Sequence, residues 1–213
     1  MNTKYIKAIL TSIFTLALYF VVYNAVSYLA YTRFGLSYVL SMMTGAGLGI
    51  LFVLYPFFFT PKPEGKISRW ETALWIFATM VLGIVMNIIL AGFSFVKNSE
   101  ALERANEYLA NGPVWQSLLL VGLFAPALEE LVFRGVIFGQ FRSAFGLIPG
   151  MIVSALVFGA IHMNLPQFVY AAAMGLVLSF VYDRSKSIVA SIAAHGLTNL
   201  AVTLFSAYIG FSR

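Results

Sequence analysis

The 213-residue chain contains no cysteine, and this absence removes whole classes of chemistry. Disulfide bonds, thiol nucleophiles and cysteine-ligated metal sites are all excluded. Charged residues are also scarce, because they make up 10% of the chain, against about 25% in a typical soluble domain. Histidine occurs only twice. The few titratable residues are therefore informative, and what matters is where each one lies.

Apolar residues take the place of the missing charge. They form 61% of the chain, and the mean hydropathy is +0.89. The apolar runs exceed the roughly 20 residues that a helix needs to cross a bilayer. They are rich in Gly, Ala, Ser and aromatic residues and do not show the alternation of barrel strands about ten residues long. We predict an all-α, polytopic membrane bundle of about 7–8 transmembrane helices, in a single domain over residues 1–213.

Seven apolar segments are visible, and an eighth, short or re-entrant helix would also fit the pattern. No long linker or low-complexity tract separates them. The expected segments are Tyr5–Tyr31, Leu36–Phe59, Trp70–Val96, Trp115–Phe141, Leu147–His162, Leu165–Tyr182 and Ile188–Ile209.

The net charge of +5 does not indicate nucleic-acid binding, because the basic residues are scattered over loops and form no stripe. In a membrane protein, basic residues instead report orientation and contact with anionic lipid. If the N-terminus is cytoplasmic, the cytoplasmic side holds Lys4, Lys7, Lys62, Lys66, Arg69, Arg142, Arg184 and Lys186. The opposite side then holds Arg33, Lys97, Arg104 and Arg213. This imbalance predicts an integral membrane protein with a cytoplasmic N-terminus.

Five titratable residues lie inside apolar segments: Glu129, Glu130, Arg134, His162 and His195. The first three belong to the stretch "APALEELVFRG". A charged side chain near the bilayer centre costs about 2.5–3.5 kcal/mol even on lenient insertion scales. Such residues normally face a protein interior or a watery cavity, where they pair with one another. The cluster therefore predicts a functional site.

Helical spacing assigns different neighbours to the two glutamates. Glu130 and Arg134 are four residues apart and can form an ion pair. Glu129 is rotated by about 100° from Glu130 and must face elsewhere. Pro126 removes a backbone hydrogen bond just before the glutamates and can bend the helix. We therefore expect one carboxylate to be neutralised by arginine and the other to be left for chemistry.

The histidines admit more than one role. His195 and Asn199 are one turn apart, so their donors could stabilise an oxyanion. A carboxylate and a second imidazole, such as His162, could instead bind and deprotonate a water molecule. The structural alternatives are a buried histidine that only satisfies hydrogen bonds and a Glu130–Arg134 pair that only fixes helix register. The glycines of "GAGLG" and "AAAMG" are interpreted as helix-packing positions, since a phosphate loop would need a preceding strand.

Three motifs occur in order on successive segments: "EELVFR", "FGAIH" and "HGLTN". Together they resemble the CAAX protease and bacteriocin-processing (CPBP, or Abi) family of intramembrane endopeptidases, which includes the type 2 CAAX prenyl endopeptidases. The resemblance covers Pro126 to Asn199, while residues 5–96 carry no diagnostic motif. It implies that Glu129 and His162 activate water, that His195 and Asn199 form the oxyanion hole, and that Glu130 and Arg134 brace the site.

The resemblance leaves the metal question open, since the family has been described both as metalloproteases and as glutamate-dependent proteases. The chain has no H-E-x-x-H motif, so a zinc site would require Glu129, Glu130, His162 and His195 to converge. A glutamate mechanism without a cofactor uses the asparagine and separates the roles, and it is the expectation here. Zinc is the alternative.

The resemblance implies a membrane-associated peptide or protein substrate. The absence of cysteine and the short N-terminal region look more like a bacterial member of the plasma membrane than a eukaryotic one. Peptide maturation, bacteriocin immunity and processing of prenylated proteins all stay open, as does the oligomeric state. Two other functions would also use a polar intramembrane cavity. These are a proton- or solute-coupled carrier and a non-catalytic membrane regulator or immunity protein.

Overall fold

The computed structural model describes residues 3–65, 67–97, 99–100, 103–104, 107 and 113–209. The regular elements begin with α1 (Thr3–Phe34), α2 (Tyr38–Phe58), α3 (Arg69–Ala91) and α4 (Ser94–Lys97). One continuous helix follows, made of α6 (Val114–Leu119), η1 (Leu120–Phe124), α7 (Ala125–Glu130), η2 (Leu131–Phe138) and α8 (Gly139–Phe145). The last elements are α9 (Leu147–Ala160), α10 (Leu165–Ser185) and α11 (Ile188–Ile209).

The predicted all-α, polytopic architecture is confirmed, because each of the seven expected segments contains a helix. Within the described ranges, α1, α2, α3, α10 and α11 are long and apolar enough to cross a membrane. Helix α9 has 14 residues and is about 21 Å long. It is therefore shorter than the roughly 30 Å hydrocarbon core. The described residues thus provide five candidate spans, against the predicted 7–8 transmembrane helices. When Val114–Phe145 counts as one helix, the described part of the chain has eight helices, including the short α4.

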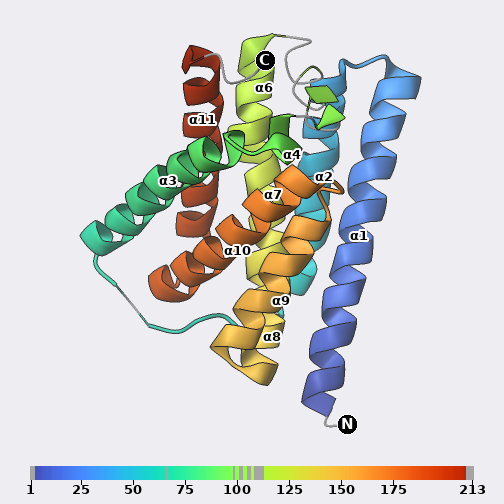
Figure 1. The fold of residues 1–213 in the computed structure, drawn as a ribbon. Coiled ribbons are helices and arrows are strands. Elements are labelled where there is room, and N and C mark those ends of the chain that lie inside the picture. The colour runs from blue at the N-terminus through green and yellow to red at the C-terminus, as the bar shows by residue number, and fades with distance from the viewer. Residues whose placement is uncertain are drawn as a thin grey trace.

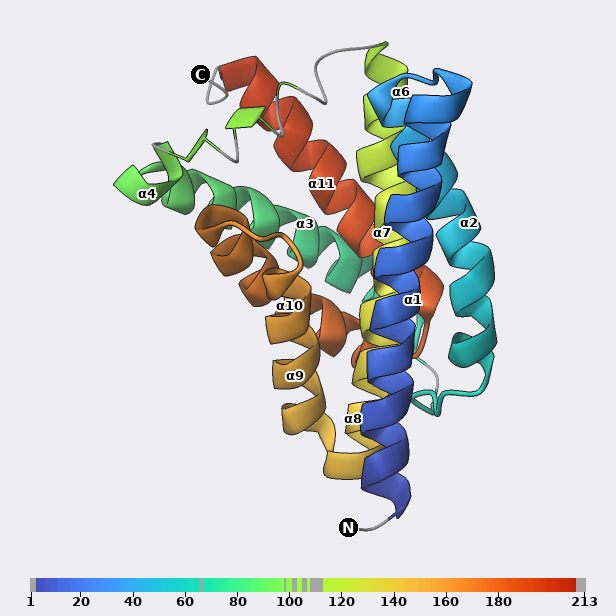
Figure 2. The same cartoon turned by 90° about the vertical axis from the view of Figure 1, so that its right-hand side faces the viewer.

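The continuous helix from Val114 to Phe145 is the axis of the fold (Figure 1). Helices α1 and α2 pair with each other and pack along it, while α11 crosses η1 and α7. Helix α10 packs against both α9 and α11. Helix α3 packs against α10 and α11 on the outside of the bundle (Figure 2). The glutamates of α7 therefore lie in the middle of the bundle, with neighbours on both sides.

Small residues set the close helix contacts, as predicted for the two glycine-rich stretches. A Cβ on Gly45 of α2 would lie 2.1 Å from Ser27 Oγ of α1. A Cβ on Gly175 of α10 would lie 2.8 Å from the Cα of Ala155 on α9. Both distances are shorter than any real side chain tolerates, so the packing interpretation is confirmed.

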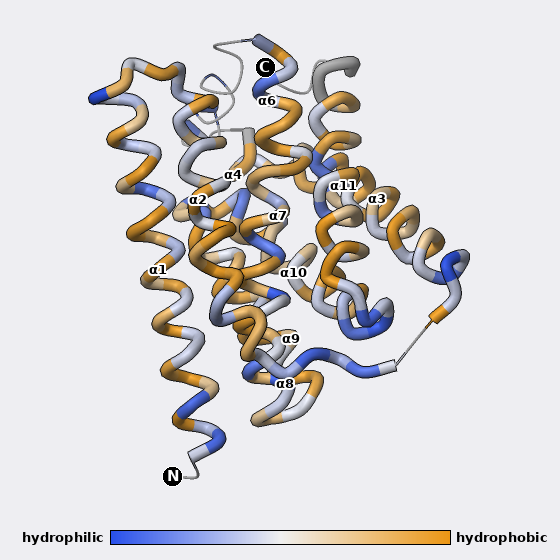
Figure 3. Tube along the Cα trace, turned by 180° about the vertical axis from the view of Figure 1, so that it is seen from behind, coloured by the Kyte–Doolittle hydropathy of each residue, from blue (hydrophilic) through white to orange (hydrophobic). Residues whose placement is uncertain are grey.

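Charges collect at one end of the bundle. Arg142 of α8 pairs with Asp183 of α10, Lys186 lies 3.6 Å from the same carboxylate, and Arg184 lies 3.0 Å from Glu71 of α3. Figure 3 shows hydrophilic residues at helix ends and loops, and hydrophobic residues along the helices between them. Helix α11 ends opposite the end at which α1 begins (Figure 1). The predicted separation of the basic residues fits this arrangement, although Lys66 and Arg213 lie outside the described residues.

Candidate active site

Glu129 and Glu130 lie on α7, between two stretches of π-helix, η1 and η2, and Arg134 lies on η2. Pro126 accounts for the first stretch. The Ala125 N–H donates to the Leu120 carbonyl, five residues back, and proline has no N–H to donate. The Val121 carbonyl is thus left without either intrahelical donor. π-turns of this kind are frequent at functional sites, since they re-aim the side chains around them.

Asn199 of α11 satisfies that carbonyl. Its side-chain Nδ2 donates to the Val121 oxygen at 3.1 Å. Buried carbonyls in a membrane need a partner, because lipid supplies none. Asn199 therefore ties α11 to the helix that bears both glutamates. An amide nitrogen carries two N–H groups, so one further donor belongs to this side chain.

Gly196 allows α11 to come this close. A Cβ at this position would lie 2.1 Å from the Gly122 carbonyl oxygen. The obstacle is backbone, which cannot turn aside as a flexible side chain can. The glycine of "HGLTN" thus sets the distance between His195 and the glutamates.

We expect Gly196→Ala to push α11 away from η1, lowering both the melting temperature and peptide hydrolysis. Thermal unfolding in detergent should show the loss. Ala193→Gly, one turn earlier on the same helix and only half-buried, serves as a control for helix propensity. Wild-type stability and activity in Gly196→Ala would show that the helices do not need this contact.

Glu130 is the most fully bonded group of the site. Its Oε1 accepts from Arg134 Nη1 at 2.8 Å and from His195 Nδ1 at 2.9 Å. Its Oε2 accepts from Ser191 Oγ at 2.5 Å. Glu130 and Arg134 are both fully buried. The predicted Glu130–Arg134 pair is confirmed, and Glu130 also orients an imidazole.

Ser191 was not among the residues selected from the sequence. It lies on α11 one turn before His195, so both residues face the same neighbour. The spacing S-x-x-x-H was visible, but serine is common in apolar helices, and nothing marked this one before its partner was known.

Glu129 faces a different space. Its Oε2 lies 3.7 Å from His195 Nε2, and its side chain is 16% exposed. Glu129 is therefore the carboxylate that a molecule entering the bundle can reach, as its 100° offset from Glu130 predicted. His195 lies between the two glutamates, with one ring nitrogen toward each.

Phe158 joins the second histidine to the site. The His162 and His195 rings both meet the Phe158 ring edge-on, with centroids 5.2 and 5.6 Å away. The Arg134 guanidinium lies over the same ring, 4.4 Å from its centroid. His162 Nδ1 bonds to the Phe158 carbonyl at 2.9 Å. If that nitrogen carries the proton, Nε2 presents a lone pair.

The arrangement does not fit the alternative zinc site. Among the described residues, no group of three or more His, Asp or Glu side chains is placed to hold a metal ion. Arg134 already neutralises Glu130, and Ser191 and His195 donate to the same carboxylate. The four residues considered as zinc ligands therefore do not converge as a ligand set.

The structure thus brings together the residues that the sequence singled out. Glu129, Glu130, Arg134 and His195 are in direct contact as one chain of interactions. His162 reaches the group through Phe158, and Asn199 through the Val121 carbonyl. The sequence had coupled Glu129 with His162, whereas the contact at 3.7 Å is with His195.

Comparison with known proteins covers the segment that carries this site. Residues 111–201 match the family model described as type II CAAX prenyl endopeptidase Rce1-like. The chain is 27% identical to YdiL of Bacillus subtilis over 140 residues, which cover 66% of this chain and 57% of YdiL. It is 30% identical to the membrane-embedded CAAX protease MroQ of Staphylococcus aureus over 153 residues, covering 68% of this chain and 60% of MroQ.

A further relative is the UPF0177 protein YbdI of Lactococcus lactis, 28% identical over 145 residues, which cover 64% of this chain and 78% of YbdI. No solved structure matches the chain. The chain spans less than two thirds of the length of the first two relatives. The segment that matches the family model contains every residue of the site, and the chain belongs to the Rce1-like type II CAAX prenyl endopeptidase family of membrane proteases.

Proposed function

We propose that this protein is an intramembrane endopeptidase that hydrolyses a peptide bond of a membrane-associated peptide or protein. The observation that carries the proposal is the pair of adjacent glutamates with different environments. Glu130 is buried and bonded by three donors. Glu129 is partly exposed and lies beside the histidine that Glu130 holds. Carboxylates whose environments differ in this way can take different roles in hydrolysis.

In the proposed reaction, Glu129 accepts a proton from a water molecule, with His162 as the second acceptor on that water. The water oxygen attacks the carbonyl carbon of the scissile bond, and the carbonyl oxygen becomes an oxyanion. In this step His195 acts as an imidazolium: its Nδ1–H donates to Glu130, and its Nε2–H donates to the oxyanion together with the second N–H of Asn199. Collapse of the intermediate breaks the C–N bond, and Glu129 returns its proton to the leaving amine.

Glu130 and Arg134 are assigned to positioning. A carboxylate that accepts from Nδ1 fixes the orientation of the imidazole, as the aspartate does in hydrolytic triads. Arg134 neutralises that carboxylate and lies over Phe158. The relative MroQ is named as a CAAX protease, which supports a substrate anchored at the membrane.

His162→Ala tests the assignment of the second acceptor. Removal of a positioned acid–base group lowers the rate by 10²–10⁴-fold, so we expect kcat to fall by about 100-fold or more. The assay uses the protein in proteoliposomes with a library of internally quenched apolar peptides, and mass spectrometry identifies the cleavage products. Leu165→Ala, an exposed residue just beyond the same turn, is the matched control.

Undiminished cleavage by His162→Ala would remove His162 from the mechanism. Uptake of solute into the same vesicles without peptide products would favour a carrier. If neither peptide products nor solute uptake is detected, a non-catalytic regulator is favoured.

A further inference from the structure

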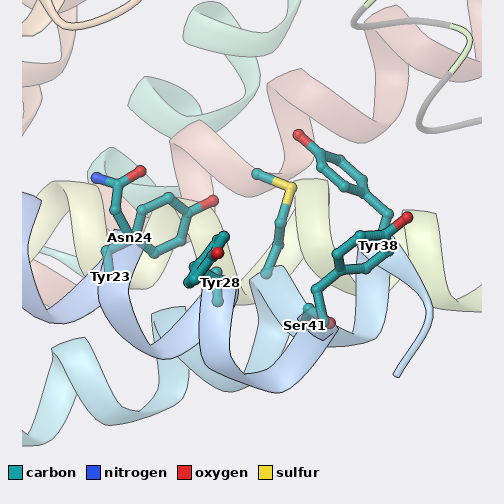
Figure 4. Close-up of a pocket in the computed structure, with 8 residues that line it drawn as sticks. Tyr23, Asn24, Tyr28, Tyr38 and Ser41 are labelled. Carbon is teal, nitrogen blue, oxygen red and sulfur yellow. The ribbon is translucent and has the colours of Figure 1, made fainter. Parts of the chain in front are cut away.

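A cavity of about 330 Å³ opens between α1 and α2. Figure 4 shows its lining side chains, and four of those lining residues are tyrosines: Tyr23, Tyr28, Tyr31 and Tyr38. The volume is at the lower end of the range for ligand sites. None of its lining residues belongs to residues 111–201, the segment that matches the family model. The catalytic motifs therefore do not account for this cavity.

The inner wall of the cavity adjoins the glutamate motif. Tyr23 stacks on Tyr19 with ring centroids 5.7 Å apart, and Tyr19 meets Phe133 of η2 at 6.1 Å. Tyr23 also packs against the apolar cluster that contains Leu128, the residue before Glu129. The cavity thus shares a wall with the helix that presents the exposed glutamate.

A second wall reaches the same helix from α2. Met42 packs on the cluster formed by Val39, Met43 and Leu120, which Phe124 and Ala125 also join. The two walls therefore meet η1 and the start of α7. A molecule in the cavity would therefore lie beside side chains that pack against the residues preceding Glu129 on this helix.

The lining indicates the chemistry of the occupant. Among the described residues, no charged side chain lines the cavity, so a charged group would lose its hydration without a partner from this part of the chain. Half of the lining residues are tyrosines, and their rings suit a large apolar side chain. Asn24, Ser27 and Ser41 add amide and hydroxyl groups among the rings. Asn24 and Ser41 each donate one hydrogen bond to a nearby backbone carbonyl, and their side-chain oxygens can still accept a hydrogen bond from a peptide N–H. Ser27 Oγ is buried without a hydrogen-bond partner in the described part of the chain.

These polar groups favour a peptide over a lipid chain. A peptide brings amide groups that need partners at membrane depth, whereas an acyl chain could use none of the hydroxyls. We propose that this cavity receives a large, uncharged apolar side chain of the peptide substrate, close to the bond cleaved at Glu129. The inference rests on the proposed function and adds to it a site that selects the substrate.

The first test compares substrate preference before and after the cavity is widened. Tyr28 and Tyr31 are 67% and 56% exposed, so their removal leaves the core untouched. For a cleaved quenched peptide, each position near the scissile bond is changed in turn from Phe to Ala. At one position, Tyr28→Ala with Tyr31→Ala should lower kcat/KM for the Phe peptide about ten-fold and leave the Ala peptide unchanged, as loss of pocket contacts predicts.

Tyr55→Ala is the matched control, because Tyr55 is an exposed tyrosine of α2 that does not line the cavity. Equal effects of Tyr55→Ala and the double variant would overturn the proposal. So would a double variant that keeps the wild-type preference at every position.

A binding measurement tests the proposal for the cavity independently of the proposed protease activity. Tyr28→Trp is introduced into the Glu129→Gln protein, and its fluorescence is titrated with the Phe and Ala peptides, with Tyr55→Trp as reference. A saturable change in the Tyr28→Trp fluorescence with the Phe peptide, and not with the Ala peptide, supports side-chain binding in the cavity even if no cleavage is ever observed. Quenching by brominated phospholipid that the Phe peptide does not relieve would identify a lipid site and overturn the proposal.

Discussion

Glu129→Gln is expected to lower kcat for peptide hydrolysis by about 10³-fold, within the range for loss of a general base. The amide has nearly the shape of the carboxylate but cannot take a proton from water. Glu129 is partly exposed and its neighbour His195 Nε2 is 3.7 Å away, so the fold does not depend on this charge. The unfolding temperature should therefore stay close to that of the wild type.

The measurement uses one purified preparation for both readouts, with initial rates on a quenched peptide and thermal unfolding in the same detergent. Glu64→Gln changes an exposed glutamate and should leave both readouts unchanged. Hydrolysis by Glu129→Gln at more than about a tenth of the wild-type rate would contradict the assignment of Glu129 as the base.

Arg134→Met should destabilise the protein by about 3–5 kcal/mol, the range for removing one partner of a buried ion pair. The substitution keeps much of the side-chain volume but leaves the Glu130 carboxylate in a dry interior. Ser191 and His195 still donate to that carboxylate, yet neither supplies the fixed charge of a guanidinium. The contact of the guanidinium with the Phe158 ring is lost as well.

The double variant Glu130→Gln/Arg134→Met gives the decisive comparison. With both charges gone, no uncompensated charge remains, and we expect it to be more stable than Arg134→Met alone. Reversible unfolding in mixed micelles would give the two free energies. A double variant less stable than the single one would show that the cost lies in lost packing at Arg134.

The helices were predictable because apolar length is a strong signal in membranes. The expected segment 165–182 became α10, Leu165–Ser185, and 188–209 became α11, Ile188–Ile209. Helix α9 was harder, since Leu147–Ala160 is as apolar as its neighbours and only its length separates it from a span. The π-turns could not be predicted from the sequence either. Proline indicated a missing hydrogen bond, but how the helix accommodates it depends on the partners that α11 brings.

The site was predictable within one helix and less so between helices. Spacing alone predicted that Arg134 pairs with Glu130 and that Glu129 faces a different direction, because both follow from helix geometry. The approach of His195 to both glutamates follows instead from the close contact of Gly122 and Gly196. A sequence shows the two glycines without showing that they meet. Tyr19 and Tyr23 were overlooked for a related reason, since tyrosine in a membrane helix is ordinary.

The π-turns have a consequence for insertions and deletions in this gene. A π-turn holds one residue more than an α-turn, and η2 spans Leu131–Phe138, directly after the glutamates. Loss of one codon from an ordinary helix rotates everything beyond it by about 100°. Here the wide turn can tighten and absorb the loss, provided that the deleted residue lies after Arg134, so that the four-residue spacing from Glu130 to Arg134 is kept. The stretch after the motif should therefore tolerate single-residue length changes better than α10 or α11, and natural length variation should concentrate there.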